Sequence, residues 1–323
     1  MNKLIKVLAV LTLLLALPFV CGAENAVESA PVVRVAGLKG PTGMALAHMM
    51  TENDGAYEFT LASAPTEVNA LVIKGDVDIA AVPVNAGAVL YNKTQGGVKA
   101  LSLITRGMLY VLEKGDSIHS VSDLAGKTVV AAGQGATPEY VTRYILDANR
   151  VEANVEYLAE HAEVVSNAIA GKADIVLLPE PQVTNLLLKA PEYRVALDVT
   201  QEFAAAAKLN GVDNAQLSMS VVIVRAEFAE AHPELVQAFM DDLNASITYA
   251  NENVHEAAQE IAALEIIPSA AVAEKALPSC TLVFVSGQEM QDQAAPLYQV
   301  LFDFNPASVG GKTPDDAFYY KAE

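Results

Sequence analysis

The residue types that perform chemistry are thinly spread along this sequence, and their spacing indicates no catalytic centre. No Gly-x-Ser-x-Gly segment occurs, so the turn that presents the nucleophile of many hydrolases is missing. Of the two cysteines, Cys21 lies in an N-terminal apolar segment, and Cys280 is left without a second thiol to pair with. The histidines show neither metal-ligand spacing nor a nucleophile partner; they are His48, His119, His161, His232 and His255. We therefore expect no enzyme, no metal site and no cofactor.

Two glycine-rich turns are better candidates for ligand binding. Residues 37–44 read Gly-Leu-Lys-Gly-Pro-Thr-Gly-Met, and residues 133–138 read Gly-Gln-Gly-Ala-Thr-Pro. Each turn is predicted to lie between a strand and a helix, where open α/β sheets bind ligands. The first N–H groups of a helix are unpaired and carry a partial positive charge, so each turn can accept an anionic or strongly polar group. Two such turns that face each other would hold a ligand from both sides.

Two more specific phosphate-binding motifs are each matched only in part, because a required glycine is missing. The second turn resembles a dinucleotide fingerprint, but Pro138 stands where a third glycine is needed for close helix packing. Residues 126–128, Gly-Lys-Thr, match the end of a phosphate loop, yet Val121 occupies the place of the required first glycine and the segment leads into a predicted strand. We expect no nucleotide site.

Charge and composition exclude further classes of protein. The 20 Lys and Arg residues against 39 Asp and Glu give a net charge of −19, so a nucleic-acid backbone would be repelled. Tryptophan is absent and aromatic residues reach only 6%, which disfavours sugar sites built on stacked indole rings. With 52% hydrophobic residues over 323 positions, the chain has material for about two globular domains.

The first 26 residues resemble an export signal with a short linker. Lys3 and Lys6 precede the apolar segment 7–20, which is shorter than a membrane-spanning helix and ends at Cys21-Gly-Ala. The sequence therefore predicts an exported protein, periplasmic or at the cell surface. Cleavage after Ala23 would remove Cys21; alternatively, Cys21 carries a lipid that anchors the protein to the membrane.

The remaining chain alternates between strand and helix patterns, which is typical of an α/β fold. The predicted strands are 32–37, 57–62, 78–82, 128–132, 155–158 and 175–178, and the predicted helices are 42–53, 66–74, 138–149 and 163–170. When residues 34–93 are laid on 130–189 without gaps, 12 of 60 positions are identical, against about a third of that number for unrelated residues. The sequence thus predicts two lobes related by an internal repeat.

Three segments carry a resemblance to a known family. Residues 118–130 contain the pattern S-x-x-D-L-x-G-K-x-V, residues 171–181 read Gly-Lys-Ala-Asp-Ile-Val-Leu-Leu-Pro-Glu-Pro, and residues 231–239 resemble an N-P-E helix start followed by V-x-x-F. Together they are similar to ABC-transporter solute-binding proteins of the nitrate/sulfonate/taurine and thiamine-pyrimidine-precursor type.

The resemblance implies a two-lobed periplasmic-binding-protein fold of type II, a Venus flytrap whose chain crosses twice between the lobes. We expect these crossings near residues 107–113 and 218–225. Lobe one would then hold residues 27–112 and 220–323, and lobe two residues 113–219. The expected partners of this monomer are a small solute, a membrane permease and its ATPase.

The candidate ligand-binding residues come mainly from the turns and strand ends. They are Lys39, Gly40, Thr42, Gly43, Thr66, Asn85, Arg106, Gln134, Gly135, Thr137 and Glu180. Glu180 matches the acidic residue of the family's Glu-Pro turn and would suit a ligand amine or ring N–H. Thr42 and Asn85 are also explained as helix caps, Lys39 and Glu180 as surface charges, and Arg106 as an interlobe salt bridge.

Capture of a solute for import is the function that these features favour. A ligand-sensing module for a membrane receptor would have the same sequence features, and an enzyme on the same fold is the third alternative. Because Lys39 and two helix starts would face Glu180, we expect an organic, nitrogen-containing solute that is polar or zwitterionic rather than nitrate or an alkanesulfonate.

Overall fold

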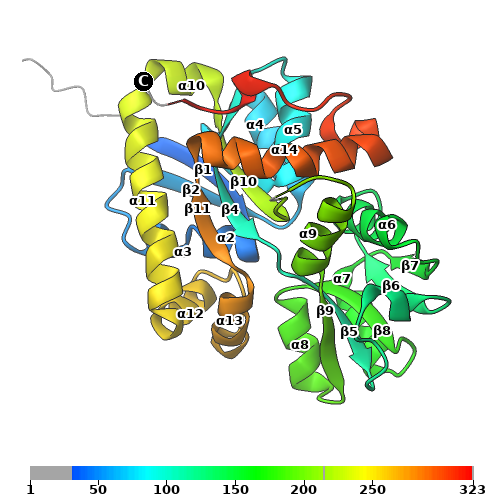
Figure 1. The fold of residues 1–323 in the computed structure, drawn as a ribbon. Helices are drawn as coiled ribbons and strands as arrows, with labels where there is room; N and C mark the ends of the chain where they lie inside the picture. The colour runs from blue at the N-terminus through cyan, green and yellow to red at the C-terminus, as the bar shows by residue number, and fades with distance from the viewer. Residues whose placement is uncertain (1–30, 214, 322–323) are drawn as a thin grey trace, which may run out of the picture. The chain divides into compact units, whose positions relative to one another are not determined.

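Two β-sheets, each flanked by helices, organise the chain in a computed structural model that describes residues 31–213 and 215–321 (Figure 1). The predicted export signal, including Cys21, lies outside the described residues. Within those residues, no helix has the length and apolar character needed to cross a membrane.

The six-stranded sheet and its helices form what we call the first lobe. Its strands lie in the order β11-β4-β10-β3-β1-β2. β1, β2 and β3 are parallel, whereas β10 runs antiparallel to both β3 and β4, and β11 runs antiparallel to β4. The bounds are β1 Val33–Leu38, β2 Tyr57–Ala62, β3 Ile79–Pro83, β4 Val98–Arg106, β10 Ser218–Arg225 and β11 Leu282–Val285.

The five-stranded sheet and its helices form the second lobe. Its order is β7-β6-β8-β5-β9, with β6, β7 and β8 parallel and β5 antiparallel to β8 and β9. The bounds are β5 Leu109–Lys114, β6 Thr128–Ala132, β7 Asn154–Leu158, β8 Ile175–Pro179 and β9 Tyr193–Asp198.

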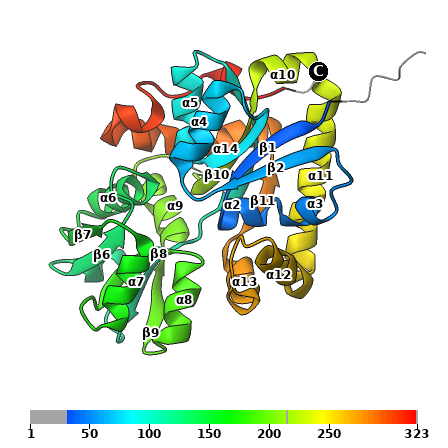
Figure 2. The ribbon, with the colours of Figure 1, turned by 180° about the vertical axis from the view of Figure 1, so that it is seen from behind.

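Helices cover both faces of each sheet (Figures 1 and 2). The first lobe has α2 Pro41–Met44, α3 Ala47–Thr51, α4 Pro65–Lys74, α5 Val84–Lys93, α10 Ala226–Ala231, α11 Pro233–Glu252, α12 Val254–Ala263, α13 Ala270–Ala276 and α14 Gly287–Phe304. The second lobe has α6 Thr137–Asn149, α7 His161–Ile169, α8 Gln182–Lys189 and α9 Val199–Leu209. Short 3-10 turns are Val121–Leu124, Leu277–Ser279, Pro306–Val309 and Asp316–Phe318.

The apolar core lies on both faces of the sheets because side chains alternate along a strand. Along β1, Val35 belongs to the buried cluster that includes α11 and α12, while its neighbour Ala36 belongs to the cluster on the other face. Ile79 and Ala80 of β3 divide in the same way. A parallel sheet buried on both faces requires the nearly continuous apolar strands that the sequence contains.

The internal repeat is visible in the geometry. β3, Ile79–Pro83, shifted by the predicted 96 residues becomes β8, Ile175–Pro179. The order β2-β1-β3-β10 in the first lobe matches β7-β6-β8-β5 in the second, and in both sheets the fourth of these strands is antiparallel to the third. The predicted α/β fold with two repeated lobes is confirmed.

The chain passes between the sheets through two adjacent segments. The first passage is residues 107–108, between β4 and β5, and the second lies between α9 and β10 and includes residues 210–213 and 215–217. The N–H of Gly107 donates a hydrogen bond to the carbonyl oxygen of Leu217 at 2.7 Å. The passages therefore lie side by side.

The predicted crossing segments are displaced from these passages. Most of segment 107–113 is β5, within the second sheet, and all of segment 218–225 is β10, within the first sheet. Residues 109–112 thus belong with the second sheet and residues 218–219 with the first, contrary to the lobe bounds expected from the sequence. The strand pattern was correct, but a strand-like sequence can lie wholly inside a sheet and does not show where the chain leaves it.

The predicted helix 42–53 is also wrong, because it forms two short helices. The N–H of Leu46 bonds to the carbonyl of Gly43, three residues back, and this tighter turn ends α2 at Met44. α4, α6 and α7 begin at Pro65, Thr137 and His161, one or two residues before their predicted starts.

We expect Gly107→Ala to destabilise the protein by about 2–4 kcal/mol. Gly107 has φ +64°, a conformation that costs a residue with a side chain roughly 1–2 kcal/mol, and a Cβ there would overlap with Oγ1 of Thr200. Gly135→Ala is the matched control, because Gly135 has φ +75° and open space around its Cα, so only the backbone cost of roughly 1–2 kcal/mol applies.

Urea unfolding of both variants measures the difference. Adding Thr200→Ala to Gly107→Ala removes the overlapping oxygen and should recover part of the loss. Equal losses for Gly107→Ala and Gly135→Ala would contradict a tightly packed first passage.

Candidate functional site

A cleft of about 410 Å³ lies where the two lobes meet beside the passages. Its polar lining residues are Thr42, Asn69, Asn85 and Ser220 from the first lobe and Thr137 and His161 from the second. Its other lining residues are Pro65, Pro83, Ala86, Val89, Met108, Gly133, Ala136, Pro138 and Met219. Among the described residues that line it there is no Lys, Arg, Asp or Glu, so the cleft presents neutral hydrogen-bonding groups.

The parallel strands place these side chains. Thr42 follows the carboxyl end of β1, Asn85 follows β3, Thr137 follows β6 and His161 follows β7. Carboxyl ends of parallel strands meet along one edge of a sheet, which is where open α/β sheets bind ligands. Each lobe thus turns its ligand-binding edge toward the cleft.

Thr42 and Ser220 form the floor on the first-lobe side. Their hydroxyl oxygens lie 3.5 Å apart, and both residues are buried. Gly43 is buried behind them; a Cβ at this position would come within 2.7 Å of the carbonyl oxygen of Leu38. Gly43 therefore allows close packing of α2 on β1, and its place in the site is structural.

Asn69 and His161 bring buried polar atoms that no described residue satisfies. Oδ1 of Asn69 and Nδ1 of His161 are both buried without a protein hydrogen-bond partner. Buried polar atoms are normally paired, so these two are positioned to bind a polar group in the cleft. Burial lowers the pKa of His161, with the charge of Glu160 opposing the shift, so the ring is neutral at pH 7 and offers one donor and one acceptor nitrogen.

The second-lobe turn is partly occupied by the chain itself. The N–H of Gly135 donates to Oε2 of Glu139 at 2.6 Å, and Glu139 also pairs with Arg143 at 2.9 Å. A carboxylate in the first turn of α6 thereby neutralises the helix start that we expected to bind an anionic ligand group. Gln134 and Gly135 are exposed and do not line the cleft.

Arg106 points to its own lobe. Its Nη2 donates to Oε1 of Gln293 at 2.8 Å and lies 3.6 Å from Oε1 of Glu289, both on α14. This ion pair joins two elements of the first lobe, so the interlobe salt bridge that was the alternative explanation for Arg106 is wrong; the predicted ligand-binding residue Arg106 lines neither pocket.

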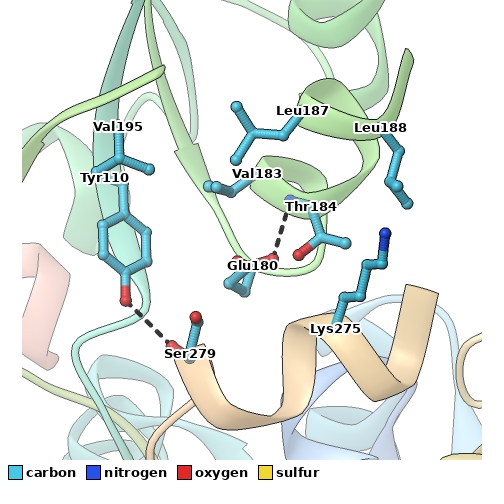
Figure 3. A pocket seen from close by; sticks show the side chains of 9 residues that line it. All are labelled: Tyr110, Glu180, Val183, Thr184, Leu187, Leu188, Val195, Lys275 and Ser279. Carbon is cyan, nitrogen blue, oxygen red and sulfur yellow. Dashed lines mark hydrogen bonds between the residues drawn. The ribbon is translucent and has the colours of Figure 1, made fainter. Parts of the chain in front are cut away.

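Glu180 lines a second pocket, of about 350 Å³, to which α8 contributes Val183, Thr184, Leu187 and Leu188 (Figure 3). Its carboxylate accepts a hydrogen bond from the N–H of Thr184 at 3.1 Å. Burial raises the pKa of Glu180, against the lowering effect of the two Thr184 hydrogen bonds. The expected opposition of Lys39 and Glu180 across one cleft is therefore absent from the described geometry, because Lys39 lines neither pocket.

Of the remaining predicted residues, three line the cleft and two line neither pocket. Thr42, Asn85 and Thr137 line the cleft, as their positions after strands indicated. Gly40 and Thr66 belong to the lining of neither pocket, and Thr66 is exposed.

Sequence reasoning missed Asn69, His161 and Ser220. The repeat contained a signal for His161, because a shift of 96 residues places it on Pro65, and both begin a helix and line the cleft. A histidine with neither metal-ligand spacing nor a nucleophile partner still has a neutral ring that donates and accepts hydrogen bonds, and no sequence motif marks that role. Asn69 and Ser220 lie within a helix and a strand, where no turn motif marks them.

Among the described residues, no group of three or more His, Cys, Asp or Glu side chains could hold a metal ion. Cys280 is buried with a free thiol.

A family model described as NMT1/THI5 like matches residues 57–257 of this chain. In the comparison with curated proteins, no sequence matches. Among solved structures, an ABC transporter from Parabacteroides distasonis is similar, with a TM-score of 0.78 and 24% identity over 90% of this chain and 99% of that chain.

Two sulfonate-binding proteins are also similar in structure. The periplasmic aliphatic sulphonate binding protein SsuA from Escherichia coli has a TM-score of 0.72 and 17% identity, over 91% of this chain and 94% of its own. The alkanesulfonate-binding protein SsuA from Xanthomonas axonopodis pv. citri, bound to MOPS, has a TM-score of 0.62 and 17% identity, over 88% of this chain and 95% of its own. The fold of the chain is that of periplasmic binding proteins.

Acidification should destabilise the protein through His161. Its pKa is lower in the folded protein than its ordinary value of about 6.5, so below that pH the unfolded chain binds a proton that the folded chain does not. The free energy of unfolding should fall as the pH drops, by at most about 1.4 kcal/mol per pH unit from this group. Urea unfolding of the wild type and His161→Gln between about pH 7.5 and 5.5 tests this; identical pH slopes would contradict burial of the ring.

Proposed function

Because the chain belongs to the NMT1/THI5-like family, we propose that it is an extracytoplasmic solute-binding protein of an ABC importer. In this role it captures a small polar organic solute in the cleft and delivers it to a membrane permease driven by an ATPase. The protein acts as a monomer without a cofactor. Its N-terminal signal leads to export, with Cys21 either removed or lipidated.

The observation that carries this proposal is the composition of the cleft wall. Asn69 and Ser220 come from one lobe and Thr137 and His161 from the other, and all are uncharged polar groups facing one space. A solute that bonds to both walls favours the arrangement in which the lobes are close together. Release to a permease then requires only that the lobes separate.

The hydrogen-bonding groups indicate the class of solute. Oδ1 of Asn69 is an acceptor, so it suits an N–H or O–H donor of the ligand. The neutral ring of His161 adds one donor or one acceptor. A nitrogen-containing heterocycle or amide offers donors and acceptors together, and the uncharged wall favours such a polar molecule over a zwitterion in this cleft.

An alkanesulfonate is the second candidate, because two structural neighbours are named for sulfonate binding. The hydroxyl groups of Thr42, Thr137 and Ser220 could donate to sulfonate oxygens. Asn69 favours the first candidate, because its unpaired side-chain oxygen accepts from a ligand N–H, whereas a sulfonate group has no hydrogen to donate.

A sensor that reports to a membrane receptor would use the same cleft. The permease and ATPase, in place of a receptor, are favoured by the structural neighbour from Parabacteroides distasonis, which is an ABC transporter. Genes for a permease and an ATPase next to the gene of this chain would support import.

We expect Asn69→Ala to weaken binding of an aminopyrimidine about two- to twelvefold, the loss of one hydrogen bond worth about 0.5–1.5 kcal/mol. Titration calorimetry with an aminopyrimidine and with MOPS measures the affinities of the wild type and the variant. Asn154→Ala is the control, since Asn154 is an exposed asparagine on β7 that does not line the cleft.

Two results decide between the ligand classes. If MOPS binds, Ser220→Ala weakens its binding and Asn69→Ala leaves its affinity unchanged or raises it, the solute is a sulfonate. If either probe binds but substitutions at both Asn69 and Ser220 leave its affinity unchanged, the cleft is not the solute site.

A further inference from the structure

The second pocket is also built by both lobes, but it shares no lining residue with the cleft. Tyr110, Glu180 and Thr184 come from the second lobe, whereas Lys275 and Ser279 come from α13 and the turn that follows it in the first lobe. The hydroxyl of Tyr110 donates to the carbonyl oxygen of Ser279 at 3.2 Å, which joins the lobes at the edge of the pocket (Figure 3). In both ribbon views α13 approaches α8 here (Figures 1 and 2).

Glu180 is a buried acid without a cation. The residue is only 4% exposed, and the hydrogen bonds to its carboxylate come from Thr184. No Lys, Arg or His within the described residues forms a salt bridge with it. A buried carboxylate is normally paired with a positive charge, because desolvation without a partner is costly. The pocket therefore offers a strong position for a ligand ammonium group.

Lys275 supplies the opposite charge on the facing wall. It stands on α13, and in Figure 3 its side chain extends beside Thr184 and Leu188. It is exposed, and within the described part of the chain no carboxylate forms a salt bridge with it. Its ammonium group is therefore available to a ligand carboxylate.

Four other residues of the pocket lining are apolar. Val183 and Leu187 pack beside Thr184, and the outer part of the wall is Leu188, 46% exposed, and Val195, 40% exposed. Large apolar side chains this exposed are few among the described residues, and two of them lie in this pocket. An aliphatic segment of a ligand would remove their surfaces from water.

We propose that this pocket binds a small zwitterion with an aliphatic body, its ammonium group on Glu180 and its carboxylate group on Lys275. The ammonium end matches the buried carboxyl group of Glu180, the carboxylate end matches the ammonium group of Lys275, and the aliphatic body lies against the apolar lining. Since Lys275 belongs to one lobe and Glu180 to the other, the bound molecule links the lobes outside the cleft. It thereby favours closed lobes independently of the solute in the cleft.

Titration calorimetry with ε-aminocaproate tests the proposal, because this probe has an ammonium group and a carboxylate at the ends of an aliphatic chain. Hexylamine and hexanoate each keep one charge and the chain. The variants are Glu180→Gln and Lys275→Gln, and the controls are Asn69→Ala in the cleft and Lys208→Gln at an exposed position of α9. Thermal melts check folding; Glu180→Gln keeps the size of the buried side chain and should fold.

The wild type should bind ε-aminocaproate more tightly than either single-charge probe. Glu180→Gln should weaken that binding tenfold or more, since hydrogen bonds to charged groups are worth about 1.5–3 kcal/mol. Lys275→Gln should weaken it less, about two- to fivefold, because exposed ion pairs contribute less. Both controls should bind as the wild type does.

Three results would overturn the proposal. They are no binding of ε-aminocaproate at millimolar concentration, unchanged binding by Glu180→Gln, and equal binding of hexanoate. A loss caused by Asn69→Ala would place the zwitterion in the cleft instead; that result would refute this inference and leave the proposed solute-binding function intact.

Discussion

The hydrogen bond from the N–H of Gly107 to the carbonyl of Leu217 holds the two passages of the chain together, and the position of the cleft depends on it. Next to it, the N–H of Glu180 donates to the carbonyl of Met108 at 2.8 Å, which fixes the end of β8 to the first passage. These bonds involve only the backbone, so they set where the strand ends of the two lobes meet without consuming side chains. A rotation about the passages would change distances across the cleft and keep the Gly107 bond, as hinge motions do.

The alternation of strands and helices was predictable because apolar periodicity reports burial, and the repeat showed that the pattern occurs twice. Tyr57–Ala62 and Thr128–Ala132 have the predicted bounds. The passages were not predictable, because an apolar strand sequence looks the same whether the strand crosses between lobes or lies within one sheet, as β5 and β10 do. The repeat relates residues 34–93 to residues 130–189, so it gives no information about α13. No motif in the sequence marked this helix, which lines the second pocket.

Site residues that follow the end of a strand were predictable from their position in the sequence. Residues whose role depends on tertiary contacts were not. Thr42, Asn85 and Thr137 follow strand ends, and the rule for open sheets found them. Gly43 and Gly135 have the right sequence for ligand binding, but packing against Leu38 and the hydrogen bond to Glu139 use them within the protein. The charge-based expectation for the ligand failed to anticipate a neutral cleft, since Lys39 and Glu180 lie elsewhere and only tertiary structure separates them.

In the proposed function, a solute bound in the cleft holds the lobes together. Apart from the passages, hydrogen bonds join the lobes at two flanks, from Tyr110 to Ser279 and from Asn305 to Tyr140, so opening the cleft would break both. Small-angle X-ray scattering of the protein with and without a saturating cleft ligand, an aminopyrimidine or MOPS as calorimetry selects, tests the claim most directly. The account predicts a smaller radius of gyration with ligand. An unchanged radius with the ligand demonstrably bound would contradict it.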